Sequence, residues 1–465
     1  METIHLKTVD PVSQELLRTA AQKGIQLNWE RYERLQPADG FLRLGLSCPY
    51  GCLQGPCRID PFGRGSDRGV CGLDRDGMVA AFLLRLTLQG VLELTNTLPS
   101  ETDSAMPIRE IFQSAAMLDR PSASSERLIR QSLLLARLAV EFLKPAAVSS
   151  DNLPCETGYG LLAHDLPVIG VTGQPAMEFV QALVQGVDRQ PLPAVVVSLG
   201  EWIASQRQFL PLACTSGEAE LLASAGAISL LIAGERSDFG LIQTAKELKI
   251  PVLSADDRPG IEEILRLANG YHSTHSRRDF APESSLKGQA NVHRTEDRLS
   301  QALKTSAGAR FALVGGFDTP QQPLGWIPVE LAKALKGTDH QVAAWGDAAL
   351  WMIKDGLASA EQTLPVQVLD PWRGPVQGVE VLGAAGLLDR LSGVCFTGLK
   401  GCRELAVALG LAAGGVKVTV ATPLPLWGSE GVRSLLTEKL AERGGRLIHF
   451  DHPAQAAEVL DAFTA

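Results

Sequence analysis

The pattern of apolar and polar positions divides the chain into a helical first part and two later parts of alternating strands and helices. Apolar residues recur at helical spacing over 12–36 and 105–145, and five of them lie close to one stripe: Leu128, Leu133, Leu134, Leu138 and Phe142. We therefore predict a helical region over residues 1–145, interrupted by a cysteine-rich loop at 48–72.

Short apolar runs follow at 167–173, 194–200, 228–234 and 250–256, most of them closed by glycine and separated by helical stretches. This alternation is typical of buried parallel strands in βαβ units. Residues 270–300 are polar and break the alternation, so we predict a linker there.

The alternation resumes with runs at 309–317, 341–347, 379–386, 392–398 and 416–426, and a helix at 429–443, the strand RLIHF and a last helix follow. The predicted fold class is α/β. A helical N-terminal head (1–145) precedes two Rossmann-like doubly wound parallel-sheet domains (146–300 and 301–465).

The composition limits the kinds of partner and the cellular compartment that we expect. A net charge of −9 without a basic cluster predicts that neither nucleic acid nor an anionic membrane is a partner. The first residues lack an apolar signal core, and no uninterrupted apolar run reaches the ~18 residues of a membrane span, so we expect a cytoplasmic protein. In a reducing compartment, clustered cysteines indicate a metal site rather than disulfides.

The loop CPYGCLQGPCRIDPFGRGSDRGVCG holds Cys48, Cys52, Cys57 and Cys71, separated by 3, 4 and 13 residues. Four thiolates match a 4Fe-4S cluster, with one ligand for each iron. Zinc also accepts four thiolates, but the paired CxxC motifs of its usual structural sites are missing. The loop's glycines allow backbone amides to turn toward the sulfurs. A 4Fe-4S cluster is the favoured prediction; zinc and redox-sensing thiols stay open.

Residues 55–72, GPCRIDPFGRGSDRGVCG, resemble the N-terminal cluster loop of the catalytic subunits of anaerobic nickel-iron-sulfur carbon monoxide dehydrogenases, in the hybrid-cluster protein superfamily. Further segments resemble the same subunits: CTSGEAEL (214–221), GGFDTPQQP (315–323), QVAAWGDAALWMIKDGLAS (341–359) and the tail from PLPLWG onward. The resemblance implies a helical head, two Rossmann-like domains, and a homodimer whose heads meet on the two-fold axis. It also implies a redox partner, such as a ferredoxin or a larger redox complex.

The chain departs from this family at the nickel-iron cluster, which one His and five Cys hold in the resembled enzymes. Cys214 stands at a ligand position, and Cys395 and Cys402 lie near the last ligand segment but out of register. The other ligand positions are occupied by Gly173, Arg236, Phe317 and Asp347. The acid-base histidine that the family has after Gly90 is absent. We therefore expect no nickel and no CO oxidation at the usual site, and we predict no catalytic residue.

A second departure lies in the head. The family often adds a bridging cluster at the dimer axis, and its two cysteine positions correspond here to Gly40 and Cys48, while Pro49 takes the place of the loop cluster's first ligand. We expect Cys48 to have taken over that role, which gives one cluster per chain. The alternative, a bridging cluster through Cys48, would leave the loop one ligand short.

The remaining candidates have simpler interpretations beside the functional ones. The turn LVGGFD (313–318) lacks the third glycine of a phosphate-binding loop. His272 and His275 have metal-like spacing but are expected to be solvated in the linker, and Asp347 is expected to cap a helix. The four other cysteines either converge on a second metal site or are buried free thiols: Cys155, Cys214, Cys395 and Cys402.

Three functional classes follow. The chain is a 4Fe-4S electron-transfer protein, an oxidoreductase with a rebuilt metal site between its α/β domains for another small substrate, or a non-catalytic subunit or scaffold of a larger redox complex. The first is preferred. Metal content separates them, because about four irons per chain is the content of one 4Fe-4S cluster.

Overall fold

The computed structural model describes residues 7–35, 46–53, 57–59, 64–95, 108–119, 121–143, 152–205, 208–275, 280–293, 308–336, 338–355, 366–369, 373–450 and 455. The chain forms two compact units, each built from segments far apart in the sequence. Unit 1 comprises Met1–Arg34, Ala147–Ala309 and Phe317–Gly374, and unit 2 comprises Leu35–Ala146, Arg310–Gly316 and Pro375–Ala465. The domain boundaries that we predict at residues 145 and 300 stay a prediction.

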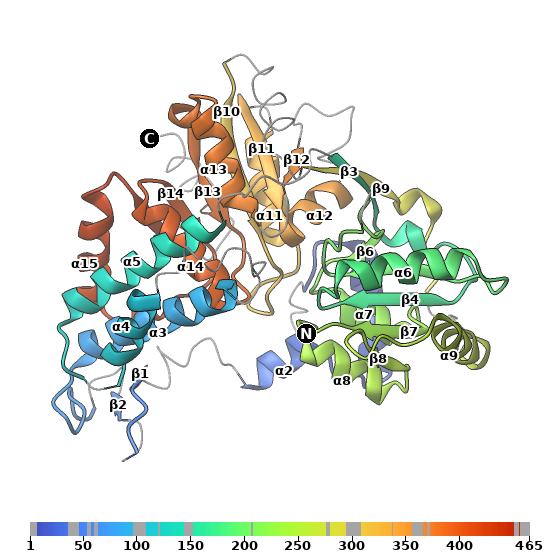
Figure 1. Ribbon diagram of the computed structural model, residues 1–465, viewed down its shortest axis with the longest axis horizontal. Helices are drawn as coiled ribbons and strands as arrows, with labels where there is room; N and C mark the ends of the chain where they lie inside the picture. Colours follow the sequence, from blue (N-terminus) through green and yellow to red (C-terminus); the bar gives the residue numbers. More distant parts are fainter. Residues whose placement is uncertain are drawn as a thin grey trace, which may run out of the picture. The chain divides into compact units, whose positions relative to one another are not determined.

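Unit 1 contains a mostly parallel sheet in the order β11-β12-β9-β3-β6-β5-β4-β7-β8 (Figure 1). Its strands are β3 (Asn152–Thr157), β4 (Val168–Thr172), β5 (Val195–Leu199), β6 (Leu212–Cys214), β7 (Leu230–Ala233), β8 (Val252–Ser254), β9 (Gly288–His293), β11 (His340–Trp345) and β12 (Val366–Leu369). β3 and β9 pair antiparallel, and the other pairs recorded in this unit are parallel. All five residues of β4 are buried, as expected for a central strand covered on both faces.

The helices of unit 1 are α1 (Pro11–Gln22), α2 (Asn28–Leu35), α6 (Met177–Asp188), α7 (Ala219–Ser224), α8 (Phe239–Glu247), α9 (Ile261–Thr274), α11 (Trp326–Leu335) and α12 (Gly346–Lys354), with 3-10 turns η3 (Tyr159–Leu162) and η4 (Ser284–Leu286). The helical spacing found over 12–36 corresponds to the two helices α1 and α2, and Gly24, where φ is +70°, lies between them. The linker expected at 270–300 is also wrong in part, since α9 extends to Thr274 and β9 lies in the sheet.

Unit 2 contains the parallel strands β10 (Arg310–Gly316), β13 (Leu391–Phe396), β14 (Lys417–Val420) and β15 (Arg446–His449), in the order β15-β14-β13-β10. Its helices are α3 (Arg75–Thr95), α4 (Ile108–Met117), α5 (Ser125–Leu143), α13 (Gly374–Ala384), α14 (Cys402–Ala413) and α15 (Glu430–Ala441), with 3-10 turns η5 (Leu388–Arg390) and η6 (Pro425–Gly428). The strand expected at 379–386 is wrong, because these residues belong to α13 and its end. The last predicted helix falls outside the described residues.

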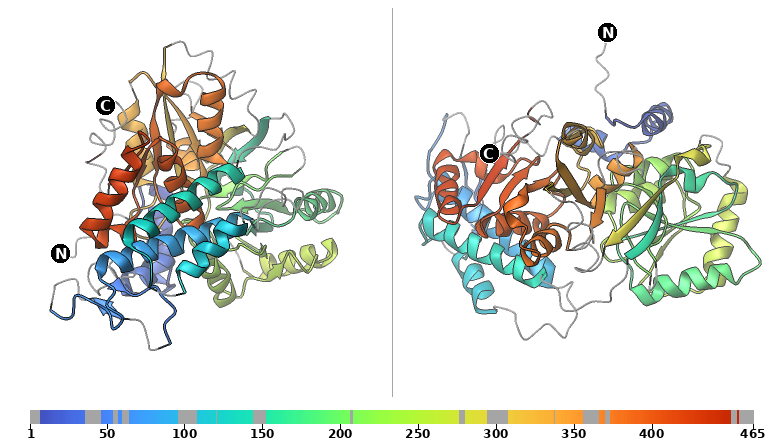
Figure 2. Two further views of the ribbon diagram at one scale, coloured as in Figure 1. Left: turned by 60° about the vertical axis from the view of Figure 1, so that its left-hand side comes forward. Right: turned by 90° about the horizontal axis from the view of Figure 1, so that it is seen from above.

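Helices α3, α5 and α14 pack side by side in unit 2, as all views show (Figure 2). Two glycines permit this close packing. A Cβ on Gly90 would lie 2.2 Å from the carbonyl oxygen of Cys402, and one on Gly410 would lie 2.1 Å from that of Ala136. α3 is long and apolar enough to cross a membrane, but 67% of its apolar window is buried inside the structure, as in a core helix. The α/β class with Rossmann-like sheets is confirmed.

Candidate metal centre

The cysteine-rich loop of unit 2 begins with a two-stranded antiparallel ladder. β1 (Leu46–Ser47) pairs with β2 (Arg58–Ile59), and Ser47 lies opposite Arg58. The ladder continues by one bond, because the backbone N–H of Cys48 donates to the carbonyl oxygen of Cys57 at 2.8 Å. Two cysteines that are nine positions apart in the sequence are thereby held in direct backbone contact.

A tight turn over residues 69–73 carries Cys71, the fourth cysteine, and contacts Cys57. The N–H of Gly69 donates to Leu73 at 2.8 Å, and that of Gly72, with φ of +84°, donates to Gly69 at 2.9 Å. Within this turn the N–H of Val70 donates to Cys57 Sγ at 3.3 Å. Backbone N–H groups aimed at sulfur are the hydrogen bonds that tune a thiolate-held cluster.

The charges of the other three loop cysteines act on Cys48. The pKa of Cys48 is raised above its usual value mainly by burial, and the negative charges of Cys57, Cys71 and Cys52 raise it further. The pKa of the buried Tyr50 hydroxyl is also raised, by burial first and then by Cys48 and Cys71. A 4Fe-4S cluster takes four cysteine ligands, so this donor set fits an iron-sulfur cluster, with Cys48, Cys52, Cys57 and Cys71 as its ligands.

The cysteine side chains of the loop are not arranged as a closed metal site. In the part of the chain that the structure describes, no three His, Cys, Asp or Glu side chains are arranged to hold a metal ion. Cys52 and Cys71 are exposed, whereas Cys48 and Cys57 are half-buried. The neighbouring Pro49 is buried, and its carbonyl oxygen accepts a 2.7 Å bond from Arg85 of α3. Gly40 lies outside the described residues.

The four other cysteines are divided between the units. In unit 1, Cys155 is buried and donates to the carbonyl oxygen of Leu210 at 3.3 Å, and burial raises its pKa to about 12. In unit 2, Cys395 is buried within β13 and burial also raises its pKa to about 12, while Cys402 starts α14 and donates to Gln89 at 3.7 Å. A second metal site shared by Cys155, Cys214, Cys395 and Cys402 stays a prediction.

Cys214 ends β6 in unit 1 next to a cluster of buried acidic groups. Asp347 accepts bonds from Ser216 N at 2.9 Å, Ser216 Oγ at 2.5 Å and Asp318 N at 2.8 Å. The expected helix cap is therefore wrong. Asp347 lies in the first turn of α12, but its carboxylate is turned toward the loops after β6 and β10 and holds them together.

Asp318 is the second acid of this cluster. Its carboxylate accepts the indole N–H of Trp351 at 2.9 and 3.1 Å. Burial, followed by the charge of Asp347, raises the pKa of Asp318 to about 8. The group is therefore mostly protonated at neutral pH, which relieves the repulsion between two adjacent buried carboxylates.

A buried ion pair completes the surroundings of Cys214. Lys354 Nζ pairs with Glu218 at 2.5 Å and lies 4.2 Å from the ring centre of Tyr159 and 4.5 Å from that of Trp351. Ser13 of α1 donates to Glu218 at 2.7 Å. Burial raises the pKa of Cys214 well above its ordinary value, with the charge of Glu218 as the next cause.

Sequence reasoning missed the partners Ser216, Glu218, Asp318, Trp351 and Lys354. The signal that could have found three of them, Ser216, Glu218 and Asp318, is position, because CTSGE and GGFDTP each place polar residues directly after a buried strand.

The remaining sequence candidates have structural roles. Gly173 has φ of +75°, and a Cβ there would lie 2.2 Å from Ser237 Oγ, so no imidazole fits at this position. His272 lies on α9, 3.4 Å from Asp165, and the ring of His275 stacks on Tyr271 with centroids 4.0 Å apart. The two histidines are thus on and just after a helix rather than in the expected linker.

Solved structures share this architecture. Carbon monoxide dehydrogenase IV from Carboxydothermus hydrogenoformans superposes with a TM-score of 0.81 at 17% identity, covering 98% of each chain. The Ni-free carbon monoxide dehydrogenase from Thermococcus sp. AM4, produced without the CooC maturase, gives 0.80 at 17% identity, covering 98% of this chain and 96% of that one. The chain has the carbon monoxide dehydrogenase fold.

Sequence comparison supports the same relationship over a short segment. Carbon monoxide dehydrogenase 1 of Methanosarcina mazei is 45% identical over 89 residues, which are 19% of this chain and 14% of that protein. Carbon monoxide dehydrogenase 1 of C. hydrogenoformans is 49% identical over 83 residues, 18% of this chain and 13% of that protein. The match thus spans about one seventh of these carbon monoxide dehydrogenases. No protein-family model matches the chain.

Proposed function

We propose that this chain is an iron-sulfur redox protein of the carbon monoxide dehydrogenase type that holds one 4Fe-4S cluster through Cys48, Cys52, Cys57 and Cys71. The observation that carries the proposal is the backbone bond between Cys48 and Cys57 together with the Val70 N–H bond to the Cys57 sulfur, which comes from the turn that carries Cys71. When bound, such a cluster supplies one-electron transfer. The chain itself would supply the four cysteine ligands and the Val70 N–H bond to the Cys57 sulfur. The exposed Cys52 and Cys71 would leave the cluster accessible for electron exchange with a redox partner.

The proposal includes loss of CO oxidation at a nickel-iron site. Around Cys214 the carboxylate of Asp347 is already engaged by three donors, and Asp318 is engaged by Trp351. Neither the glycine at 173 nor the phenylalanine at 317 offers a ligand atom. This arrangement favours electron transfer over a rebuilt metal site, because oxygens committed to internal hydrogen bonds would have to exchange them for a metal.

Anaerobic metal analysis tests both parts. Protein purified without oxygen should contain about four irons and four sulfides per chain and no nickel, and CO should not reduce a viologen dye in its presence. An EPR signal of a reduced 4Fe-4S cluster should account for the iron. Nickel together with CO-dependent dye reduction would overturn the loss of CO oxidation, while zinc in place of iron would overturn the cluster assignment.

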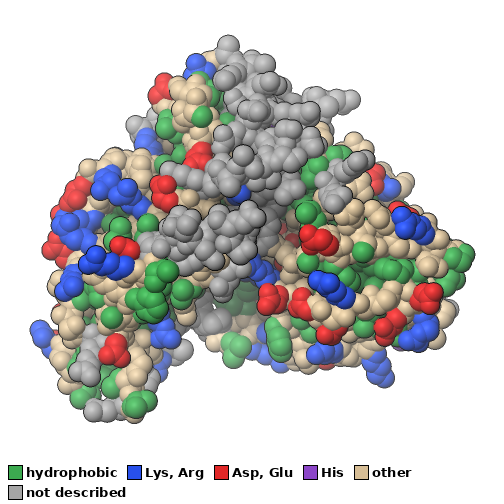
Figure 3. Space-filling view, in the orientation of Figure 1, with side chains coloured by type: hydrophobic (Ala, Val, Ile, Leu, Met, Phe, Trp, Pro, Cys, Tyr) green, Lys and Arg blue, Asp and Glu red, His purple; other side chains and the backbone are tan. Residues whose placement is uncertain are grey.

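We also propose a homodimer formed through the cysteine-rich head, with a ferredoxin-like protein or a larger redox complex as electron partner. Beside the cysteines, Leu53 is fully exposed and Val70 is 87% exposed, and exposed apolar side chains of this size favour a protein contact. On the face shown in Figure 3, Lys and Arg are intermixed with Asp and Glu over the described residues.

Light scattering at micromolar concentration should give twice the mass of one chain. The double change Leu53→Glu with Val70→Glu should shift the population to monomer, because it places charges in the proposed contact. Phe239→Glu is the matched control, since Phe239 is 79% exposed but belongs to unit 1. A monomer at this concentration for the unmodified protein, or a dimer that survives the double change, would contradict the proposal.

A further inference from the structure

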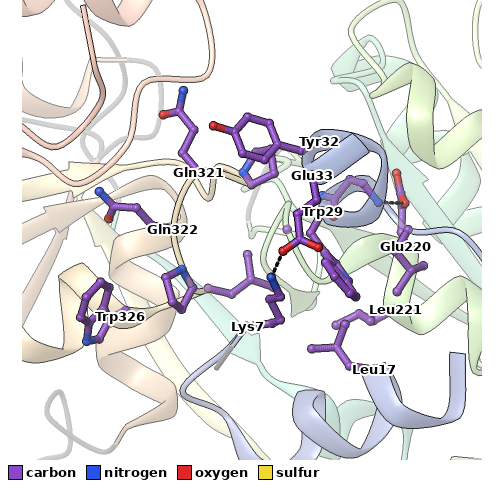
Figure 4. Close-up of a pocket in the computed structure, with 16 residues that line it drawn as sticks. Lys7, Leu17, Trp29, Tyr32, Glu33, Glu220, Leu221, Gln321, Gln322 and Trp326 are labelled. Carbon is purple, nitrogen blue, oxygen red and sulfur yellow. Dashed lines mark hydrogen bonds and ion pairs between the residues drawn. The ribbon is translucent and has the colours of Figure 1, made fainter. Parts of the chain in front are cut away.

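A cavity of about 450 Å³ lies within unit 1, and none of the loop cysteines is among its lining residues (Figure 4). This volume is within the range of small-molecule sites, roughly 300–1,000 Å³. Its aromatic walls come from two helices, with Trp29 and Tyr32 on α2 and Trp326 at the start of α11. Apolar side chains complete the lining: Leu17, Leu27, Leu221, Leu324, Pro320 and Pro323.

The lining includes buried polar atoms that lack a hydrogen-bond partner. Among the described residues, the indole N–H of Trp29 and the side-chain Oε1 of Gln321 have no hydrogen-bond partner. Buried polar atoms in native proteins nearly always have one, and an exception calls for an explanation such as an absent ligand. The pair consists of one donor and one acceptor, so a ligand that satisfies both must carry an acceptor and a donor of its own.

The charges of the lining are already balanced. Lys7 pairs with Glu33, and its ammonium lies 4.6 Å from the ring centre of Trp29. Glu220 pairs with Arg31 at 2.5 Å and accepts the backbone N–H of Asn28 at 2.9 Å. The cationic side chains recorded in and beside the cavity thus face carboxylates, so a phosphate group would find no uncommitted positive charge among them.

We propose that this cavity binds an uncharged planar nitrogen heterocycle of purine size, as a free base or nucleoside. The aromatic and leucine side chains contact the ring, a ring nitrogen accepts from Trp29 Nε1, and an exocyclic amine donates to Gln321 Oε1. The site belongs wholly to unit 1 and uses none of the loop cysteines, so it stands or falls separately from the cluster.

Isothermal titration calorimetry with adenosine, purine riboside and AMP tests this assignment. Adenosine should bind one to one with a micromolar Kd. Purine riboside lacks the exocyclic amine and should bind about tenfold more weakly, and AMP should bind at least tenfold more weakly because its phosphate meets no free cation. Trp29→Phe keeps a ring but removes the N–H, and should weaken adenosine binding about five- to tenfold.

The variant Gln321→Leu isolates the second contact. It should weaken the binding of adenosine but not that of purine riboside, so that the two ligands have similar Kd values. Gln243→Leu, on the exposed face of α8, should change neither Kd. Circular dichroism confirms that each variant is folded, and if Trp29→Phe is not, Gln321→Leu decides. The absence of adenosine binding up to 1 mM, AMP binding as tight as adenosine, or an unchanged adenosine Kd in both cavity variants would overturn the proposal.

Discussion

Replacing Cys57 by Ser should abolish the broad ~400 nm absorbance of the anaerobically purified protein and reduce its iron from about four atoms per chain to less than one. Cys57, one of the four proposed ligands, makes contacts through both its backbone and its sulfur. Its carbonyl oxygen accepts the N–H of Cys48 and its sulfur accepts the N–H of Val70. A serine hydroxyl is a poor iron ligand at neutral pH, so one iron of the cluster would lose its anchor.

Cys71→Ser should give the same loss, and both variants should lower the melting temperature, because metal binding stabilises the loop that it closes. Cys402→Ser is the matched control. Cys402 is half-buried in the same unit but bonds only to Gln89 among the contacts recorded for its side chain, and a hydroxyl can make that bond too. A Cys57 or Cys71 variant that retains full iron and absorbance would show that the loop thiols are not the ligands.

Strands buried on both faces were the part of the fold that the sequence predicts best. β4, β7 and β13 are short apolar runs, and their burial leaves little choice of structure. β9 was missed because its sequence, GQANVH, is largely polar, and its place in the sheet comes from pairing with β3 and β12. Such pairing is a tertiary effect that no local pattern carries.

The error at α13 has a different cause. A short apolar run such as Val379–Leu382 fits a buried strand and a buried helix equally well, and only the packing of Val376, Val381 and Leu382 in the core decides. The real strand, β12, lies just before it at Val366–Leu369.

The candidate site shows the same contrast between local and long-range information. The four loop cysteines are close in sequence, so a shared site could be proposed from their spacing alone, and the bond between Cys48 and Cys57 lies within that short segment. The bonds of Asp347 to Ser216 and Asp318 join positions 131 and 29 residues apart, and nothing in the local sequence indicates them. The helix-cap interpretation of Asp347 was therefore the best local prediction, and it failed for a non-local reason.

Asp318→Asn should make the protein more stable at alkaline pH. The pKa of Asp318 in the folded protein is raised from 3.8 to about 8, so between these values the folded state holds one proton more than the unfolded state. The free energy of unfolding therefore falls as the pH rises through this window. The stabilising contribution is complete below about pH 4 and is lost as the pH passes 8.

Asparagine removes this dependence while its amide oxygen still accepts the N–H of Trp351. Each pKa unit corresponds to about 1.4 kcal/mol, so the difference in unfolding free energy between Asp318→Asn and the unmodified protein should grow by about 4 kcal/mol from pH 5 to pH 8. Urea unfolding of the anaerobic protein at several pH values measures it. Asp257→Asn, at an exposed side chain for which no ion pair is recorded, is the control and should give a constant difference. Parallel pH profiles for Asp318→Asn and the unmodified protein would mean that Asp318 is ionised in the folded state at neutral pH, and that the cluster around Asp347 carries two negative charges rather than one.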